Sequence, residues 1–324
     1  MKKSYYCNRI ETSLNFLPER IAFCCGSATC PSIDVTSYSK EKILTERKRI
    51  KDLLKQGVIP FECSCCFEYK EQENKNFLKE FFQKKKEEKI KHIIINHYKQ
   101  CDCNCIYCTQ KMVYEDDIQN YELLPILKEF FNQDWIDIDN LRVEFQGGNV
   151  SMLKEFPAII DFLKEKGCRE YFFLVNHIKY LKEIEETANI SHAHACISLD
   201  SGSREVFKQI KKVDAFDIVI ENIKRLKNNS KAYVSLKYII ISGVNDSIEE
   251  VKKFCNIVKE VNANAIYTEI DFRDTLMSSK YERNYVVPKH YYEIVDYFKE
   301  FSVKNNIDFS IMAYSKVVFE NGCA

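Results

Sequence analysis

The chain has 324 residues, of which 48 are lysine or arginine, 48 are aspartate or glutamate and 15 are cysteine, and 45% of its residues are hydrophobic. The formal net charge of zero argues against a general nucleic-acid or membrane-surface binder. The length permits one large or two modest domains with an ample core. No run of about 18 apolar residues and no secretory segment is recognisable. We therefore expect a cytoplasmic chain whose cysteines bind metal rather than form disulfides.

The first 88 residues contain a group of cysteines on both sides of a predicted helix. Ile43, Leu44, Ile50, Leu53 and Leu54 follow a basic amphipathic helix that ends near Gly57. The cysteines are Cys7, the pair Cys24 and Cys25, Cys30, and the segment 61–66, where Cys63 and Cys66 form a C-x2-C pair. On spacing, the first interpretation is a four-thiolate [4Fe–4S] cluster on Cys7, Cys24 or Cys25, Cys63 and Cys66. A structural zinc ion and reduced thiols without metal are the alternatives.

From about residue 89 onward the chain alternates between strand and helix patterns. The predicted strands are Ile90–Asn96, Leu141–Gln146, Glu170–Val175, Ala195–Asp200, Ala232–Ile241, Ala265–Asp271 and Ile307–Ala313. The predicted helices are Leu123–Phe131, Phe156–Leu163, Ile218–Leu226, Ile248–Val258 and Tyr291–Phe301. Repeated βα units imply an α/β fold with a parallel sheet, either open or curled into a barrel.

One face of several predicted strands is polar. Its residues are Arg142, Glu144, Gln146, Ser198, Asp200, Ser235, Lys237, Tyr267, Glu269, Asp271 and Arg273. A closed TIM barrel fills its interior with branched apolar side chains, so these strands predict an open, TIM-like partial barrel whose polar face lines a wet cavity. The alternative is that edge strands expose their polar faces to solvent.

A cysteine loop follows the first of these strands. Cys101, Cys105 and Cys108 have the spacing C-x3-C-x2-C. Iron–sulfur clusters are normally held by four thiolates, so three thiolates would hold three irons of a cubane cluster and leave the fourth iron open. Cys103 lies inside the loop, either as a bystander or as a competing ligand. Zinc is a second possibility, although structural zinc sites usually combine two pairs of ligands across a longer span.

With Tyr107 directly before Cys108, the loop resembles the cluster loop of radical S-adenosylmethionine (SAM) enzymes. The resemblance implies a partial (β/α)6 barrel, a catalytic [4Fe–4S] cluster and SAM as cofactors. In that family the open iron chelates SAM, and an electron from the cluster breaks a carbon–sulfur bond. The resulting 5′-deoxyadenosyl radical then takes a hydrogen atom from the substrate. The protein orients these cofactors and excludes competing reactions.

The second predicted strand of the barrel ends in Gly147, Gly148 and Asn149. Glycines at the carboxyl end of a parallel strand let the backbone approach a ligand closely. The segment is similar to the Gly-Gly-Glu motif of the same family, whose backbone would meet the amino group of SAM. Asn149 replaces the usual glutamate, so it can accept a hydrogen bond but carries no charge.

Further matches come from the ends of later strands. By resemblance, Asn176 and Ser198 would contact SAM, Lys237 would pair with its carboxylate, and Val244 would lie near its adenine, in a pocket completed by Tyr107. Candidates to hold a polar substrate are Asp200, Glu269, Asp271 and Arg273. Each of these residues could instead belong to an ordinary loop between a strand and a helix.

The cysteine group of residues 1–88 resembles, in reverse chain order, the SPASM and twitch modules that carry auxiliary clusters in many radical SAM enzymes. The expected organisation is therefore a Cys-rich module at 1–88 and a radical SAM partial barrel at 89–324, with a C-terminal helix and strand. The expected function is modification of a peptide or carbohydrate, with a reducing partner such as flavodoxin or ferredoxin and no nucleic-acid or membrane partner. Two alternatives are an activating enzyme that installs a glycyl radical on a partner protein, and a zinc-binding interaction protein on a degenerate barrel.

Overall fold

The computed structural model describes residues 4–7, 9–24, 30–63, 66, 70–72, 89–108, 110, 121–271, 273–274, 286–312, 315–316 and 319. They form two compact units. The first comprises Met1–Lys99, Asp116–Gly147 and Ala158–Arg169, and the second comprises Gln100–Glu115, Gly148–Pro157 and Glu170–Ala324. Among the described residues, no helix combines the length and the apolar character needed to cross a membrane.

The first unit contains five strands in the order β7-β6-β2-β3-β4. Their bounds are β2 Ser13–Leu17, β3 Arg20–Ala22, β4 Ser32–Asp34, β6 His92–Ile95 and β7 Arg142–Phe145. β2, β6 and β7 are parallel, whereas β3 and β4 continue the sheet in antiparallel fashion. Every residue of β2 and β6 is buried, which explains the nearly continuous apolar run of β6. A separate antiparallel pair joins β1 (Ser4–Tyr6) to β5 (Lys70–Gln72).

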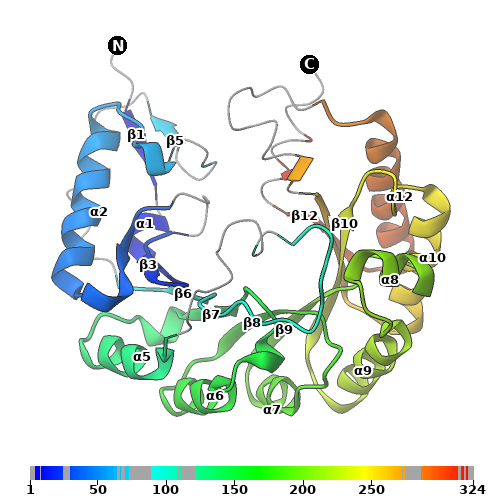
Figure 1. Ribbon diagram of the computed structural model, residues 1–324, viewed down its shortest axis with the longest axis horizontal. Helices are drawn as coiled ribbons and strands as arrows, with labels where there is room; N and C mark the ends of the chain where they lie inside the picture. Colours follow the sequence, from blue (N-terminus) through cyan, green and yellow to red (C-terminus); the bar gives the residue numbers. More distant parts are fainter. Residues whose placement is uncertain are drawn as a thin grey trace. The chain divides into compact units, whose positions relative to one another are not determined.

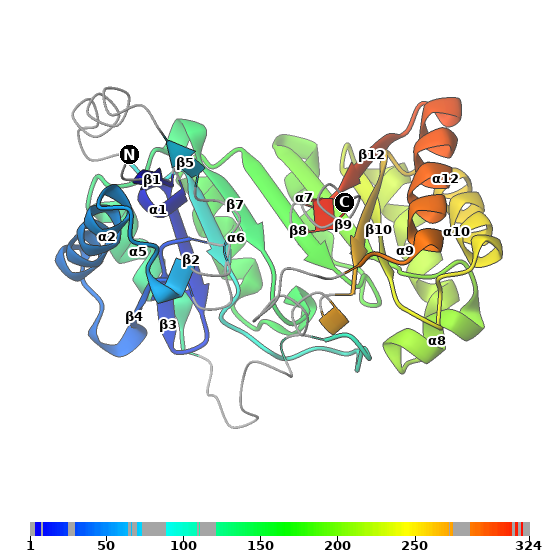
Figure 2. The ribbon, with the colours of Figure 1, turned by 90° about the horizontal axis from the view of Figure 1, so that it is seen from above.

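Helix α2 (Lys40–Lys55) is the long helix predicted between the N-terminal cysteines. It begins after Ser39, whose hydroxyl accepts a hydrogen bond from the Lys42 amide at 3.1 Å, and it ends before Gly57, where φ is +79°. It contacts β1 and β4, and Figure 2 shows it at the edge of this unit. The other helical segments of the unit are α1 Arg9–Thr12, η1 Val35–Ser37, η2 Phe61–Cys63, α5 Leu123–Asn132 and η3 Ile138–Asn140. Helix α6 (Phe156–Glu165) begins in the second unit and continues in the first.

The second unit is built on five parallel strands that follow one another in chain order. They are β8 Glu170–Val175, β9 His192–Ser198, β10 Tyr233–Ile240, β11 Ala265–Ile270 and β12 Asp308–Ile311. The helices of the unit are α7 Lys182–Ile190, α8 Arg204–Lys211, α9 Phe216–Asn229, α10 Ile248–Glu260 and α12 Lys289–Asn305, and a short turn, η4, spans Val150–Met152. Figure 1 shows α9, α10 and α12 along the outer side of these strands, as right-handed βα units require.

The register of the strands brings the polar residues near their carboxyl ends side by side. Ser198 on β9 is the partner of Lys237 on β10, and Lys237 is in turn the partner of Tyr267 on β11. Along β11 the alternation is as predicted, because Tyr267 and Glu269 are half-buried whereas their neighbours are buried. The carboxyl ends of parallel strands are where ligands of α/β proteins bind.

The predicted α/β fold with a mostly parallel sheet is confirmed, and each predicted strand and helix overlaps an observed one. The sequence missed α7 and α8, which are short and highly charged, and it placed the start of β9 three residues late. Closure of the strands into a partial barrel remains a prediction, as does the division at residue 88. Strand β2, which precedes that division, pairs with β6, which follows it.

Candidate functional site

The cysteine loop is held in place by backbone hydrogen bonds to the end of α8. The amides of Asn104 and Ile106 donate to the carbonyls of Lys211 and Ile210, at 2.9 and 3.0 Å. Earlier in the loop, the carbonyl of Gln100 accepts a hydrogen bond from the Asn149 amide at 2.8 Å. Residues 101–108 form neither a helix nor a strand. These tertiary hydrogen bonds therefore provide partners for backbone amide and carbonyl groups that a helix or sheet would otherwise pair.

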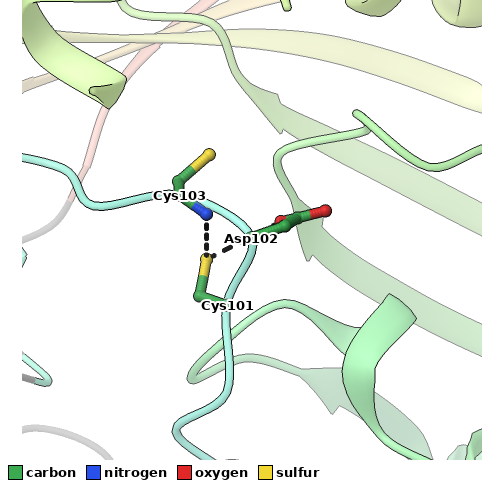
Figure 3. A group of neighbouring side chains, drawn as sticks. All are labelled: Cys101, Asp102 and Cys103. Atoms are coloured by element: carbon green, nitrogen blue, oxygen red, sulfur yellow. Dashed lines mark hydrogen bonds between the residues drawn. The ribbon is translucent and has the colours of Figure 1, made fainter. Parts of the chain in front are cut away.

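The thiols of the loop differ in their exposure. Cys101 is exposed, Cys105 and Cys108 are partly buried, and Cys103 is buried. The amide of Cys103 donates to the Cys101 sulfur at 3.4 Å, and Figure 3 shows this bond. Asn176 Nδ2 also donates to the sulfurs of Cys101 and Cys103, at 3.7 and 3.2 Å. Donors that point at sulfur stabilise the thiolate form.

Contacts within the loop shift the pKa values of three of its thiols in different directions. The Cys103 thiol and the Lys211 ammonium lower the pKa of Cys105 to about 6, against the effect of burial. A hydrogen bond from the Cys103 side chain likewise lowers the pKa of Cys101. The same contacts raise the pKa of Cys103 far above its ordinary value. Because metals bind the thiolate, the lowered pKa values of Cys101 and Cys105 favour the form that a metal ligand needs.

Asp102 and two asparagines form a polar cluster next to the loop. Asn149 Nδ2 donates to Asp102 Oδ1 at 3.0 Å and to Asn176 Oδ1 at 2.8 Å. Asn176 Nδ2 also donates to Asp102 Oδ1. Asn149 and Asn176 are buried, with 2% and 8% of their surfaces exposed. Asn149, which stands where the related motif has a carboxylate, is thus bonded to the carboxylate of Asp102.

A buried ion pair fixes the aromatic residue of the loop. Lys211 Nζ lies 2.5 Å from Asp200 Oδ2 and donates to the Tyr107 hydroxyl at 2.7 Å, and that hydroxyl donates to Asp200 at 2.6 Å. The second oxygen of Asp200 accepts the Ile239 amide at 2.8 Å. Burial lowers the pKa of Lys211 but the charge of Asp200 raises it, and the net shift is upward. Both side chains are almost completely buried, so Asp200, predicted as a substrate contact, is occupied in holding Tyr107.

Two further ion pairs lie at the ends of β10 and β11. Lys237 Nζ is 2.5 Å from Glu269 Oε2, and the charge of Glu269 keeps the pKa of Lys237 raised despite burial. Arg273 Nε lies 3.1 and 3.0 Å from the two oxygens of Asp271, and Arg273 Nη1 donates to the Ile106 carbonyl at 2.5 Å. Arg273 therefore links Asp271 to the cysteine loop.

The remaining predicted contacts are distributed over both units. Ile106, Tyr107 and Val244 pack against a core cluster that contains Ile210 and Ile239. Ser198 is half-buried at the end of β9. In the first unit, Gly147 has φ of +102°, and a Cβ at this position would lie 2.5 Å from Asn96 Oδ1 and 2.9 Å from the Tyr98 carbonyl.

The sequence missed three residues that support the loop. Lys211 ends a charged helix, Asn245 Nδ2 donates to the Asp200 carbonyl at 2.8 Å, and Asp102 lies within the loop itself. Only Asp102 was accessible to sequence reasoning, because it stands between two cysteines. The pairing of Lys211 with Asp200 depends on a turn in tertiary structure that no local pattern reports.

The donor set of the loop fits an iron–sulfur cluster. Three thiols supply three of the usual four ligands, and two of them have lowered pKa values. Among the described residues, Cys101, Asp102 and Cys103 form the one set of three or more potential metal ligands whose atoms all lie within 4.8 Å of one another. This set would suit a single metal ion instead of a cluster.

The loop and the βα units together define a class of protein: an α/β protein with a loop of three cysteines that fits an iron–sulfur cluster. Residues 95–255 match the family described as the Radical SAM superfamily. The chain carries a radical SAM domain, as the cysteine spacing predicted, and a [4Fe–4S] cluster and SAM are the cofactors that this family implies.

Curated relatives share this domain. A GTP 3′,8-cyclase of Thermodesulfovibrio yellowstonii is 26% identical over 176 residues, which cover 53% of each chain. A GTP 3′,8-cyclase of Clostridium botulinum is 24% identical over 187 residues, covering 56% of this chain and 57% of that one. The chain thus spans about half the length of the curated relatives it matches.

Solved structures resemble the fold over a longer stretch. Streptococcus suis SuiB bound to the precursor peptide SuiA has a TM-score of 0.53 at 12% identity, covering 89% of this chain and 57% of SuiB. The protein anSMEcpe with bound AdoMet has a TM-score of 0.50 at 16% identity, covering 69% of this chain and 64% of that one. These likenesses support the radical SAM fold.

Proposed function

We propose that the chain cleaves SAM reductively at a [4Fe–4S] cluster held by Cys101, Cys105 and Cys108 and uses the product to modify a peptide. The observation that carries this proposal is the loop of three cysteines inside the matched domain, where contacts lower the pKa of two thiols. When bound, the cluster and SAM supply a 5′-deoxyadenosyl radical that takes a hydrogen atom from the substrate. A reducing protein such as flavodoxin or ferredoxin would provide the electron.

In this proposal Asp102 provides the negative charge that position 149 lacks. Its carboxylate accepts hydrogen bonds from Asn149 and Asn176, which together fix its orientation. A positioned carboxylate is a suitable partner for the ammonium group of SAM. The proposed SAM pocket is completed by the residues at the ends of the strands that the sequence predicted for this role. They are Gly147, Gly148, Asn149, Asn176, Ser198, Lys237 and Val244.

The charges near the strand ends favour a peptide over a nucleotide triphosphate. Lys211, Lys237 and Arg273 are each paired with a carboxylate, namely Asp200, Glu269 and Asp271. A triphosphate needs several cations whose charge is not already balanced. The peptide-bound SuiB structure, with the same fold, is consistent with a peptide substrate. Glu269, Asp271 and Arg273 are the proposed polar contacts to it, and Asp200 acts through Tyr107.

GTP cyclisation is the second candidate, because the curated relatives are GTP 3′,8-cyclases. The matched part covers about half of those proteins, so the rest of their length has no counterpart in the alignment. Incubation of the reduced protein with SAM and GTP separates the two functions. A cyclised nucleotide formed at a rate comparable to 5′-deoxyadenosine would establish the second candidate and refute the first.

The decisive test is release of 5′-deoxyadenosine from SAM by anaerobically reconstituted, dithionite-reduced protein. We expect release by the wild type and by Cys103→Ala, and none by Cys105→Ala, because only the last removes a cluster ligand. Iron and sulfide should be bound in the first two proteins. Zinc without iron in the wild type would instead support the zinc-binding interaction protein. A stable glycyl radical on a partner protein would support the activating enzyme.

A further inference from the structure

The first unit contains a second group of cysteines that the proposed function does not use. Cys7, Cys24, Cys63 and Cys66 line one small cavity. They come from three separate segments: Cys7 follows β1, Cys24 follows β3, and Cys63 ends η2. Cys25, the other candidate of the sequence analysis, lies outside the described residues. Tertiary structure therefore brings together four thiols that are up to 59 positions apart in the sequence (66 − 7).

The C-x2-C pair has the turn that metal-binding pairs require. The Cys66 amide donates to the Cys63 carbonyl at 3.0 Å, and the Cys63 amide donates to the Pro60 carbonyl at 2.9 Å. These two consecutive turns lie next to the cavity, and Cys63 and Cys66 both line it. Such a turn presents two thiols to one centre, as in thiolate-ligated metal sites.

The other walls of the cavity are suited to an iron–sulfur centre. Ile10, Ile50 and Leu54 are buried and supply apolar surface that limits the access of water. The one carboxylate of the lining, Glu62, accepts a hydrogen bond from Arg49 at 2.5 Å. The thiols are thus the donors that the cavity offers to a soft metal.

A buried positive charge lies near these thiols. Only 3% of Arg47 is exposed, and its guanidinium donates to the Ser13 carbonyl at 2.8 Å and lies 5.1 Å from the Trp135 ring. Its Nε is buried and has no hydrogen-bond partner within the described part of the chain. The charge of Glu11 and, less strongly, that of Cys24 act on the arginine. Burying a cation is costly without a nearby anion, and a metal centre with four thiolates carries net negative charge.

The separation of the sulfurs distinguishes a cluster from a single zinc ion. A tetrahedral zinc with bonds of 2.3 Å would hold its sulfurs about 3.8 Å apart. Among the described residues, no three of these four thiols have sulfurs that all lie within 4.8 Å of one another. A cubane cluster binds each thiolate at a different corner and so holds the sulfurs farther apart.

From this geometry we infer that Cys7, Cys24, Cys63 and Cys66 bind a second [4Fe–4S] cluster, fully coordinated by protein. All four irons have a thiolate ligand, so this cluster has no open iron for a substrate or SAM. Binding releases the thiol protons, and Arg47 offsets part of the resulting negative charge. The inference rests on residues of the first unit and is independent of the proposed function.

The test uses the full chain with Cys101, Cys105 and Cys108 all changed to alanine, reconstituted with iron and sulfide without oxygen. This triple variant cannot hold the loop cluster, so any remaining cluster belongs to the N-terminal group. We expect about four irons and four sulfides per chain, with the Mössbauer spectrum of a [4Fe–4S] cluster. Adding Cys66→Ser should remove at least half of that iron. Adding Cys30→Ala should not, because Cys30 is buried close to Cys24 but does not line the cavity.

Several results would overturn the inference. They are a folded triple variant without iron, about one zinc per chain in its place, or full iron retention after Cys66→Ser. Circular dichroism establishes folding for each protein. If Cys66→Ser unfolds the triple variant, iron is counted instead in two other proteins, namely Cys66→Ser in the wild-type chain and a separate Cys7→Ser variant. Loss of the iron of one cluster supports the inference, and full retention of iron overturns it.

Discussion

At the scale of single residues, the candidate site is organised by hydrogen bonds that decide which groups are charged. Cys103 is the clearest case, because its contacts lower the pKa values of Cys101 and Cys105 and so favour their thiolate forms. The buried pair of Asp200 and Lys211 acts similarly on Tyr107. Removing one member of a buried pair leaves an uncompensated charge, so we expect the loss of Asp200 or Lys211 alone to destabilise this part of the protein.

Replacing the Asp102 carboxylate tests its proposed role toward SAM. In Asp102→Asn we expect the dissociation constant of SAM to rise roughly ten- to hundredfold, since a hydrogen bond to a charged group contributes about 1.5–3 kcal/mol. Equilibrium binding to the anaerobically reconstituted protein measures this change, and iron content should stay constant. Asp139→Asn, at an exposed position, is the matched control. Unchanged affinity in Asp102→Asn would contradict the role.

His177 makes the stability of the protein depend on pH. It is buried with φ of +61°, and burial lowers its pKa to about 4. In the unfolded chain the histidine pKa is about 6.5. Between pH 6.5 and pH 4 the unfolded chain therefore binds more protons than the folded protein, and the free energy of unfolding falls as the pH is lowered. Between pH 7 and pH 5 the wild type should lose about 2 kcal/mol more than His177→Asn, a residue that tolerates positive φ. Urea unfolding at both pH values measures the difference, and parallel losses in the two proteins would refute the assignment.

At the scale of secondary-structure elements, the ends of strands and helices carry the chemistry. Strand β10 ends beside Asp200, and α8 ends at Lys211, which meets that carboxylate. Helix α10 is tied to the loop after β9 because Glu250 accepts hydrogen bonds from the Gly202 amide at 2.7 Å and from Ser203 at 2.9 Å. Turns between elements therefore hold the polar groups, whereas the elements themselves provide the apolar core.

Gly147, directly after β7, tests how tightly one such turn is built. Gly147→Ala should lower the free energy of unfolding by roughly 2–4 kcal/mol, because it adds a Cβ at positive φ and within 2.9 Å of the Tyr98 carbonyl. Gly167→Ala is the control, since Gly167 has φ of +86° but no atom within 4 Å of the added Cβ. It should cost only about 1–2 kcal/mol. Chemical denaturation measures both free energies of unfolding. An equal decrease in the two variants would show that the contact between the added Cβ and the Tyr98 carbonyl is relieved without a loss of stability.

At the scale of the whole molecule, each unit has its own cysteine group. The loop at 101–108 belongs to the second unit, and Cys7, Cys24, Cys63 and Cys66 belong to the first. In the proposed scheme the three-thiolate centre performs chemistry on SAM, and the four-thiolate centre is closed to it. Ligand binding to either centre should stabilise the folded protein, because the unfolded chain lacks the arranged donors.

SAM should therefore stabilise the chain only when the loop cluster is present. At a concentration one hundred times its dissociation constant, SAM is expected to add about 2.7 kcal/mol to the free energy of unfolding of the reconstituted wild type. The Cys105→Ala protein should show no such increase. Anaerobic thermal unfolding with and without SAM measures the effect. An equal increase in both proteins would place SAM away from the loop.

The sequence by itself determined most elements of the α/β fold from residue 89 onward and the class of the protein. Apolar periodicity located strands β6 to β12, because each must bury its apolar face whatever its neighbours are. The parallel strand β2 was not predicted. The C-x3-C-x2-C spacing identified the radical SAM domain, since three thiols in eight residues can reach one cluster without help from the rest of the chain. The charged helices α7 and α8 were missed because they are only nine and eight residues long and carry short apolar patterns.

Tertiary structure decided the roles within the site. It directed Asp200 toward Lys211 and Tyr107, joined Asp102 to Asn149, and assembled the N-terminal thiols from segments far apart in the chain. These arrangements arise because a buried charge or donor must find a partner in three dimensions, and many sequence separations satisfy that requirement equally well. Local patterns therefore specify which groups are available, and the packing of the chain specifies which of them meet.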